Sequence, residues 1–163
     1  GTKEINASLT SLIANATGSN GITGGQALDL NAEGLVLGQS ELEHIYRQKT
    51  GKLLRACVLS PCCFIDPGLE KTTALERYVD AIGLAFQIKD DIIEAEGATE
   101  EIGKSSHSDI DQSKATFPKM FGLNHSKNRV DDLLFNAKEA LSVFDKDAEP
   151  LISMAEMIVS RSS

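Results

Sequence analysis

Several features are scarce in this sequence of 163 residues, and each shortage excludes a class of protein. No apolar run approaches the roughly 20 residues needed to cross a bilayer, so we expect no integral membrane segment. No basic-then-apolar stretch opens the chain, so no secretory signal is indicated and the cytoplasm is the expected compartment. Lys and Arg number 16 against 24 Asp and Glu, and the resulting net charge of −8 argues against nucleic acid as a partner.

Cysteine is also rare, since the chain contains only Cys57, Cys62 and Cys63. An odd count with two adjacent positions does not make the paired framework of a disulfide-stabilised fold. A zinc site would need a fourth soft ligand, and none of the three histidines is near these cysteines in sequence. We therefore expect reduced, partly buried cysteines, as is usual in cytosolic proteins.

Alternating strand patterns are absent as well, and helical periodicity takes their place. The expected helices cover residues 4–16, 40–60, 70–96 and 124–144, with a last helix starting near Pro150. Residues 98–117 lack clean periodicity and are expected to form a loop, after which Pro118 begins a short apolar segment ending at Gly122. No repeat, low-complexity tract or internal domain boundary is visible. The predicted fold class is all-α.

Local signals predict where these helices begin, end and face. Ser40 and Glu43 have the spacing of a capping box, Asn124 is a candidate N-cap, and Gly97 is a candidate C-terminal stop. The pair Gly24 and Gly25 costs about 1 kcal/mol per residue relative to alanine inside a helix, which predicts close approach of a neighbouring helix or ligand. Three-and-four spacing places six residues on one predicted face: Leu42, Ile45, Tyr46, Lys49, Leu53 and Cys57.

An acidic cluster occupies the predicted end of the helix over residues 70–96. Asp90, Asp91, Glu94 and Glu96 crowd the last turn before Gly97. A helix C-terminus carries about half a negative charge, so each acid there costs roughly 0.3–1 kcal/mol. Asp90 and Glu94 are four apart and share a face, where like charges repel. A bound cation would reverse these signs, and oxygen ligands on one face suit Mg²⁺. The alternative is a solvated acidic helix end.

Four short motifs, in the same order along the chain, resemble those of one enzyme family. FQIKDDIIE at residues 86–94 resembles the second aspartate-rich region of the trans-prenyl diphosphate synthases, typically FQxxDDxxD. GGQALDL at residues 24–30 resembles their GGQxxDL helix, and residues 49–51 match their KTG motif. Residues 103–118 resemble their GKxxGxDxxxGKxTYP loop. One such match is weak, but four in order are specific. Bacterial farnesyl diphosphate synthases, the geranyltranstransferases, are the members most closely resembled.

This resemblance implies a helical bundle around a central cavity and a head-to-tail condensation reaction. The implied substrates are isopentenyl diphosphate and an allylic diphosphate, with geranyl diphosphate giving farnesyl diphosphate. The implied steps are Mg²⁺-dependent ionisation of the allylic partner, attack by the isopentenyl double bond, and loss of a proton. Mg²⁺, which Mn²⁺ can replace, is the implied cofactor. The family is commonly homodimeric, so a homodimer is expected.

The resemblance also implies site residues in three groups. The catalytic set, which grips the diphosphate by charge or hydrogen bonds, is Lys49, Thr50, Gln87 and Lys104. The rest of the substrate-binding set is Gln26, Asp29, Phe86, Lys114 and Arg161. The metal set is Asp90, Asp91, Glu94 and Asp109. Within these, Asp29 is expected to orient Lys49, Asp90 to hold a metal directly, and Arg161 to close over the isopentenyl site.

The sequence departs from the family pattern in two ways. Glu94 replaces the usual third aspartate, and His107 and Ser113 replace glycines of the loop. The first aspartate-rich motif, DDxxD or its longer form, is absent upstream of Gly24. We therefore expect residues 1–163 to be the C-terminal half of a single polyprenyl synthase domain, a truncated chain that is inactive alone. A half bundle would leave apolar helix faces uncovered, which favours association.

Several other functions stay open at this stage. A geranylgeranyl or longer-chain synthase would share these motifs, because product length is set mostly in the absent half. A non-catalytic subunit resembling these synthases is a second alternative, although the ligand lysines and acids are retained. A plain acidic bundle that binds Mg²⁺ would leave the lysine motifs unexplained. A terpene cyclase is disfavoured because its asparagine-serine-glutamate metal motif is not seen after Gln87.

Overall fold

The chain forms a bundle of helices in a computed structural model that describes residues 1–101 and 114–162. Every regular element in those two ranges is helical, which confirms the predicted all-α class. No helix in this described part is long and apolar enough to cross a membrane. In chain order the elements are α1 (Thr2–Thr17), α2 (Ile22–Asn31), α3 (Gln39–Tyr46), η1 (Arg47–Gly51), α4 (Lys52–Leu59), η2 (Ser60–Cys63), α5 (Leu69–Glu101), α7 (Phe117–Phe121), α8 (Leu123–Ala140), η3 (Ser142–Ala148) and α9 (Glu149–Ser160).

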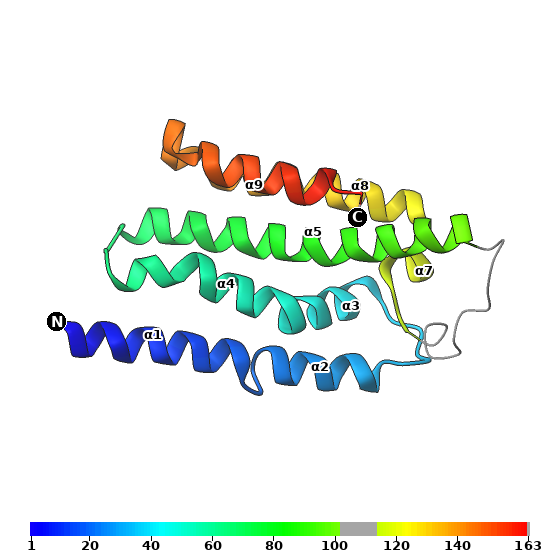
Figure 1. The fold of residues 1–163 in the computed structure, drawn as a ribbon, viewed down its shortest axis with the longest axis horizontal. Helices are drawn as coiled ribbons and strands as arrows, with labels where there is room; N and C mark the ends of the chain where they lie inside the picture. Colours follow the sequence, from blue (N-terminus) through cyan, green and yellow to red (C-terminus); the bar gives the residue numbers. More distant parts are fainter. Residues whose placement is uncertain (102–113, 163) are drawn as a thin grey trace.

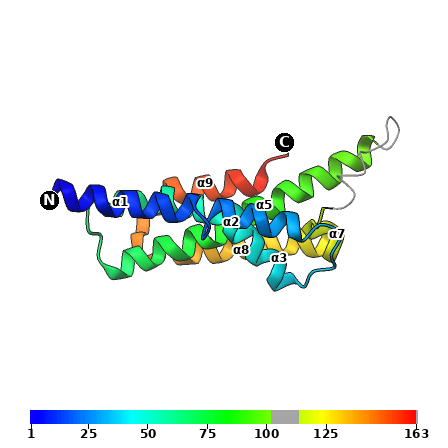
Figure 2. The ribbon, with the colours of Figure 1, turned by 90° about the horizontal axis from the view of Figure 1, so that it is seen from below.

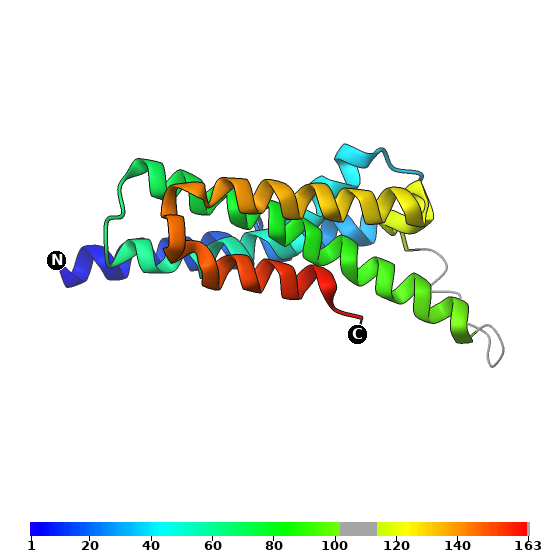
Figure 3. The same cartoon turned by 90° about the horizontal axis from the view of Figure 1, so that it is seen from above.

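Helix α5 is the centre of the bundle, and most other elements pack around it. In Figure 1 it runs lengthwise between α8 and α9 on one side and α3 and α4 on the other, with α1 and α2 end to end beyond them. Figure 3, seen from above, shows α8 and α9 lying over α5. Because α5 has neighbours on several sides, its core residues spread over more than one stripe: Tyr78, Val79, Ile82, Leu84, Ala85, Ile88 and Ile92.

The predicted end of this central helix at Gly97 is wrong, because α5 continues to Glu101. One glycine costs a helix only about 1 kcal/mol relative to alanine, which is too little to stop a helix stabilised by packing. Asp90 and Glu94 therefore lie about two to three turns before the end, beyond the reach of the terminal dipole. Figure 2 shows this end of α5 projecting past the other helices. These acids therefore do not oppose the helix dipole, and no cation is needed to offset it. A metal site at this position has to be inferred from side-chain contacts.

The start of α3 also differs from the prediction. Glu41, rather than Glu43, makes the capping contact, accepting a hydrogen bond of 2.8 Å from the backbone N–H of Gly38. The predicted box from Ser40 to Glu43 is therefore displaced by two residues. A glycine can occupy the N-cap position here because the carboxylate of Glu41, the third residue of the helix, accepts the hydrogen bond from the glycine's backbone N–H.

Most of the remaining helix boundaries lie within about two residues of the predicted ones, but α8 ends at Ala140 rather than at residue 144, because the chain changes to the 3-10 segment η3 at Ser142. Residues 4–16 lie inside α1, residues 117–121 form the short helix α7, and Pro150 lies in the first turn of α9 as predicted. The N-cap of α8 is Gly122 rather than the predicted Asn124, which lies inside the first turn. Gly122 precedes that turn with φ 85°, a left-handed conformation that glycine adopts without strain. The chain therefore reverses direction sharply between α7 and α8.

The segment η1 is a π-helical turn, which the sequence pattern did not reveal. The backbone N–H of Lys52 donates to the carbonyl of Arg47, five residues back. A π turn inserts one extra residue into a helix and so shifts the face of everything that follows. Leu53 and Cys57, predicted to face inward, are exposed, whereas their successors Leu54 and Val58 pack against the core.

The three cysteines are free, as the sequence predicts for a reduced protein. Cys62 and Cys63 are half-buried in η2, as expected. Cys57 is exposed, because it lies on the face that the π turn rotates outward.

Candidate active site

The π turn η1 presents Lys49 and Thr50 toward the helices on either side of it. The ammonium of Lys49 forms an ion pair with the carboxylate of Asp29 on α2, and both side chains are largely buried. Backbone contact between the two elements is very close at Gly25. A Cβ added there would lie 2.3 Å from the backbone nitrogen of Lys49. The glycine pair in α2 therefore allows close approach of a neighbouring helix, which is one of the two reasons predicted for it.

Thr50 connects the π turn to the central helix. Its hydroxyl donates a hydrogen bond of 2.9 Å to the side-chain oxygen of Gln87 on α5. With that oxygen occupied, the NH₂ group of the Gln87 amide is the donor: one hydrogen bond goes to the Asp91 carboxylate, where it acts to lower the Asp91 pKa, and the second N–H can serve another partner. The structure thus brings together four residues of the predicted set from three elements: Asp29, Lys49, Thr50 and Gln87.

Asp90, one turn along α5 from Gln87, contacts the C-terminal end of the chain. Its carboxylate forms an ion pair with the guanidinium of Arg161 and is 42% exposed. The same guanidinium lies 4.1 Å from the centre of the Phe86 ring and donates to the Phe86 carbonyl at 3.1 Å. The Nε of Arg161 is buried and has no hydrogen-bond partner in the described part of the chain.

Asp91 lies in a different environment from Asp90, although the two are adjacent. It is 2% exposed, and its Oδ2 accepts hydrogen bonds from the Tyr46 hydroxyl and, at 2.9 Å, from the backbone N–H of Phe117. Burial raises the pKa of the Asp91 carboxyl despite these donors. It also raises the pKa of the Tyr46 hydroxyl, helped by the nearby Asp91 charge. Asp91 therefore holds α3 and α7 against α5, and its role as a metal contact stays a prediction.

The other predicted residues are more dispersed. Glu94 is exposed, and its carboxylate lies 3.8 Å from the ammonium of Lys114, so these two residues pair with each other. The side chain of Gln26 is exposed on α2. The predictions for Lys104 and Asp109 lie outside the described residues, as do those for His107 and Ser113.

The carboxylates in the described part of the chain offer few ligands for a metal ion. Within residues 1–101 and 114–162, no group of three or more His, Cys, Asp or Glu side chains is arranged to hold one. Mg²⁺ in phosphate-binding enzymes commonly uses one or two carboxylates and completes its shell with water and phosphate oxygens. The exposed carboxylate of Asp90 fits that requirement, since its partner Arg161 is itself partly exposed.

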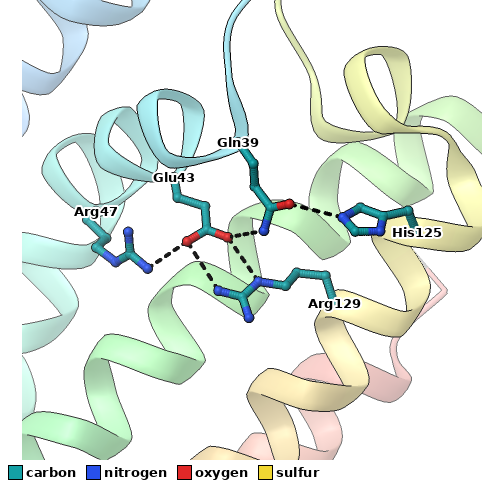
Figure 4. Close-up of polar contacts among 5 residues, drawn as sticks. All are labelled: Gln39, Glu43, Arg47, His125 and Arg129. Carbon is teal, nitrogen blue, oxygen red and sulfur yellow. Dashed lines mark hydrogen bonds and ion pairs between the residues drawn. The ribbon is translucent and has the colours of Figure 1, made fainter.

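A buried acid beside the site was missed by the sequence reasoning. Glu43 is 5% exposed and accepts hydrogen bonds from Arg47, Arg129 and Gln39 (Figure 4). The side-chain oxygen of Gln39 in turn contacts the ring of His125. Burial acts to raise the pKa of the Glu43 carboxyl, but these bonds and the Arg129 charge outweigh it, so the pKa is lowered. The four-residue spacing to Arg47 could have suggested part of this cluster. Arg129 is 86 positions away and could not have been found.

An all-helical bundle in which a lysine, a threonine and a glutamine converge beside an exposed aspartate has the architecture of the isoprenoid synthases. The comparison with protein families identifies the group within that class. The model of the polyprenyl synthetase family matches residues 2–149, and the chain belongs to this family.

Characterised relatives extend over more sequence than this chain does. It is 41% identical to a farnesyl diphosphate synthase of Haemophilus influenzae over 159 residues, which cover 95% of this chain and 53% of that protein. It is 38% identical over 150 residues to a dimethylallyltranstransferase of Fischerella ambigua, covering 91% of this chain and 43% of the relative. The chain thus spans about half the length of the curated relatives it matches.

Solved structures give the same result. An FPP/GFPP synthase from Zymomonas mobilis superposes with a TM-score of 0.81 at 32% identity, over 95% of this chain and 51% of that one. A geranyltransferase from Helicobacter pylori, solved in complex with magnesium and isoprenyl diphosphate, gives a TM-score of 0.74 at 28% identity over 95% and 50% of the two chains.

Proposed function

We propose that this chain is part of a prenyltransferase that condenses isopentenyl diphosphate with geranyl diphosphate to form farnesyl diphosphate. One observation carries the proposal: the π turn directs Thr50 to Gln87 on α5, one turn before Asp90, and the adjacent Lys49 to Asp29 on α2. A cation, two neutral donors and an exposed carboxylate are the groups needed to bind a diphosphate together with a divalent metal. The family and the farnesyl diphosphate synthases among the relatives support this assignment.

Each side chain has a task that follows from its contacts. Lys49, held by Asp29, supplies positive charge where the leaving diphosphate gains negative charge. Gln87 orients the diphosphate through an N–H of its amide, Thr50 donates to it when its hydroxyl leaves Gln87, and Phe86 provides an apolar wall for the isoprenoid chain. Arg161 donates to the anion when it leaves Asp90. Lys104 is proposed as a further diphosphate contact on the basis of its motif.

Mg²⁺ is the proposed cofactor. Asp90 would hold it, and Glu94 and Asp109 would contribute through water. When bound, the metal neutralises part of the diphosphate charge. Asp91 is left out of this set, because it is buried and its carboxylate accepts hydrogen bonds from Tyr46, Phe117 and Gln87 within the protein.

The proposal also covers the domain to which the site belongs, the oligomeric state and the compartment. We propose that residues 1–163 form the C-terminal half of one polyprenyl synthase domain, that the active protein is a homodimer, and that it works in the cytoplasm. The first aspartate-rich motif of the family is not present in these residues, so the chain alone is expected to lack turnover.

Binding of inorganic pyrophosphate tests the site without requiring turnover. Titration calorimetry with MgCl₂ present would compare the unaltered chain with Lys49→Met and with Lys138→Met. Lys138 is a matched control, because it also pairs with a carboxylate on a neighbouring helix and is similarly exposed. We expect Lys49→Met to weaken binding about tenfold or more, since a charged hydrogen bond contributes roughly 1.5–3 kcal/mol. Absence of binding by the unaltered chain, or equal binding by Lys49→Met, would contradict the proposal.

The reaction itself is tested with geranyl diphosphate, isopentenyl diphosphate and Mg²⁺. We expect a farnesyl product only when the other half of the domain is supplied. Geranylgeranyl diphosphate synthases also occur among the relatives, so a longer product would select that alternative. No product from the completed domain would favour a non-catalytic subunit.

A further inference from the structure

The cluster around Glu43 joins the π turn to a helix on the far side of α3. Arg129 of α8 makes two hydrogen bonds to the Glu43 carboxylate, from Nε to Oε1 at 2.9 Å and from an NH₂ group to Oε2 at 3.2 Å. Arg47 donates to the same Oε2 at 2.8 Å. Figure 4 shows the two guanidinium groups approaching one carboxylate from opposite elements. Without that carboxylate, two positive groups would face each other with no partner between them.

Arg47 connects this cluster to the shape of the π turn. It is the first residue of η1, and its carbonyl accepts the five-residue hydrogen bond from the Lys52 N–H that defines the turn. Its side chain is fixed by Glu43, one helical turn earlier. The guanidinium of Arg47 is therefore held by the buried Glu43 carboxylate, and its backbone carbonyl is held by the π hydrogen bond. Lys49 and Thr50 lie inside the loop that this bond closes.

We propose that Glu43 is a positioning residue that holds the π turn in the conformation presenting Lys49 and Thr50. It acts through Arg47 on the turn itself and through Arg129 on the placement of the turn relative to α8. That the presented groups bind diphosphate rests on the proposed function, but the effect of Glu43 on the turn does not. Glu43 has no contact with Lys49 or Thr50, so it acts on them indirectly, through Arg47 and Arg129.

Amide hydrogen exchange measures this effect in the ligand-free chain. The variants are Glu43→Gln, which removes the charge, and Arg47→Met, which breaks only the contact at the turn. Arg47 is 44% exposed, so the second variant keeps the buried pair of Glu43 with Arg129 and is expected to fold normally. Glu156→Gln is the control, because Glu156 forms an exposed ion pair with Lys138 far from the turn. Exchange at the Lys52 amide is compared with exchange at residues 79–84 in the core of α5.

We expect exchange at Lys52 to accelerate about tenfold or more in Glu43→Gln and Arg47→Met relative to the α5 core, and to be unchanged in Glu156→Gln. We also expect the dissociation constant for Mg²⁺-pyrophosphate to rise about tenfold in Glu43→Gln, since a misplaced Lys49 loses a charged contact. Unchanged exchange at Lys52, or a uniform rise across the whole chain, would overturn the positioning role. So would faster exchange at Lys52 with unaltered pyrophosphate affinity. If the unaltered chain binds no pyrophosphate, the proposed function fails, and the exchange comparison alone decides the role of Glu43.

Discussion

Replacement of Gly25 by alanine tests how closely α2 approaches the π turn. The added Cβ would lie 2.3 Å from the backbone nitrogen of Lys49, 2.5 Å from its Cα and 2.7 Å from the carbonyl carbon of Gln48. Ordinary contact begins at 3.4 Å, so the two backbones would have to separate by about 1 Å. All three atoms belong to the main chain, so no side-chain rotation can relieve the clash.

The expected loss of stability at Gly25 follows from two opposing effects. Overpacking of this kind destabilises by about 1–3 kcal/mol, and the upper part of that range applies because no flexible group yields. Alanine returns up to about 1 kcal/mol through its higher helix propensity. The net loss is roughly 2 kcal/mol, which for a chain of this size lowers Tm by about 4–8 °C. Separation of α2 from η1 also pulls Asp29 away from Lys49, so pyrophosphate affinity should fall as well.

Thermal unfolding followed by circular dichroism measures the stability change, with Gly97→Ala as the matched control. Gly97 is an exposed helical glycine on α5, and an added Cβ there meets nothing within 4 Å. That variant should gain up to about 1 kcal/mol, raising Tm by about 2–4 °C. If Gly25→Ala is as stable as the unaltered chain, the close approach of α2 to the π turn is refuted.

Three further predictions concern buried groups near the site. In urea unfolding, Asp91→Ala should lower the free energy of unfolding by about 2–4 kcal/mol, because it leaves the buried donors of Tyr46 and Phe117 without an acceptor. Asp91→Asn keeps an acceptor and should lose less than half as much. Leu54 packs against the core and Leu53 is exposed, so Leu54→Ala should lower the free energy of unfolding by about 1–3 kcal/mol and Leu53→Ala by less than about 1 kcal/mol. A larger loss for Leu53→Ala would contradict the register shift at the π turn. The lowered pKa of Glu43 means that its stabilisation is complete above the ordinary glutamate pKa of 4.5 and is lost as the pH falls through the lower folded value. Urea unfolding of Glu43→Gln should therefore show a flatter decline below pH 4.5 than that of the unaltered chain.

Local chemistry made much of the fold predictable. Apolar residues at helical spacing predicted α1, α3, α5, α8 and α9, because an amphipathic helix must bury one stripe wherever it packs. Pro150 predicted a helix start for a reason contained in the residue itself, its fixed φ and missing N–H. Gly97 failed as a stop signal because packing along α5 outweighs the propensity of one residue.

The candidate site was only half accessible to the same reasoning. The motifs nominated Lys49, Thr50, Gln87 and Asp90, and the structure places these on η1 and on one stretch of α5. The spacing could not separate Asp90 from Asp91, because adjacent helix positions differ by about 100° and their neighbours decide which one meets solvent. Tyr46 and Phe117, which hold Asp91 in the core, come from positions 45 and 26 residues away.

The sequence by itself therefore determined the all-helical class, the order of the helices and the residue types available to bind a diphosphate, since these depend on periodicity and on side-chain chemistry. Tertiary structure alone decided which of those residues meet. The π turn shifted the register after Arg47, burial removed Asp91 from the exposed acids, and Arg129 reached Glu43 across 86 positions. Each of these outcomes depends on contacts between separate helices, and contacts at long sequence separation leave no local pattern to read.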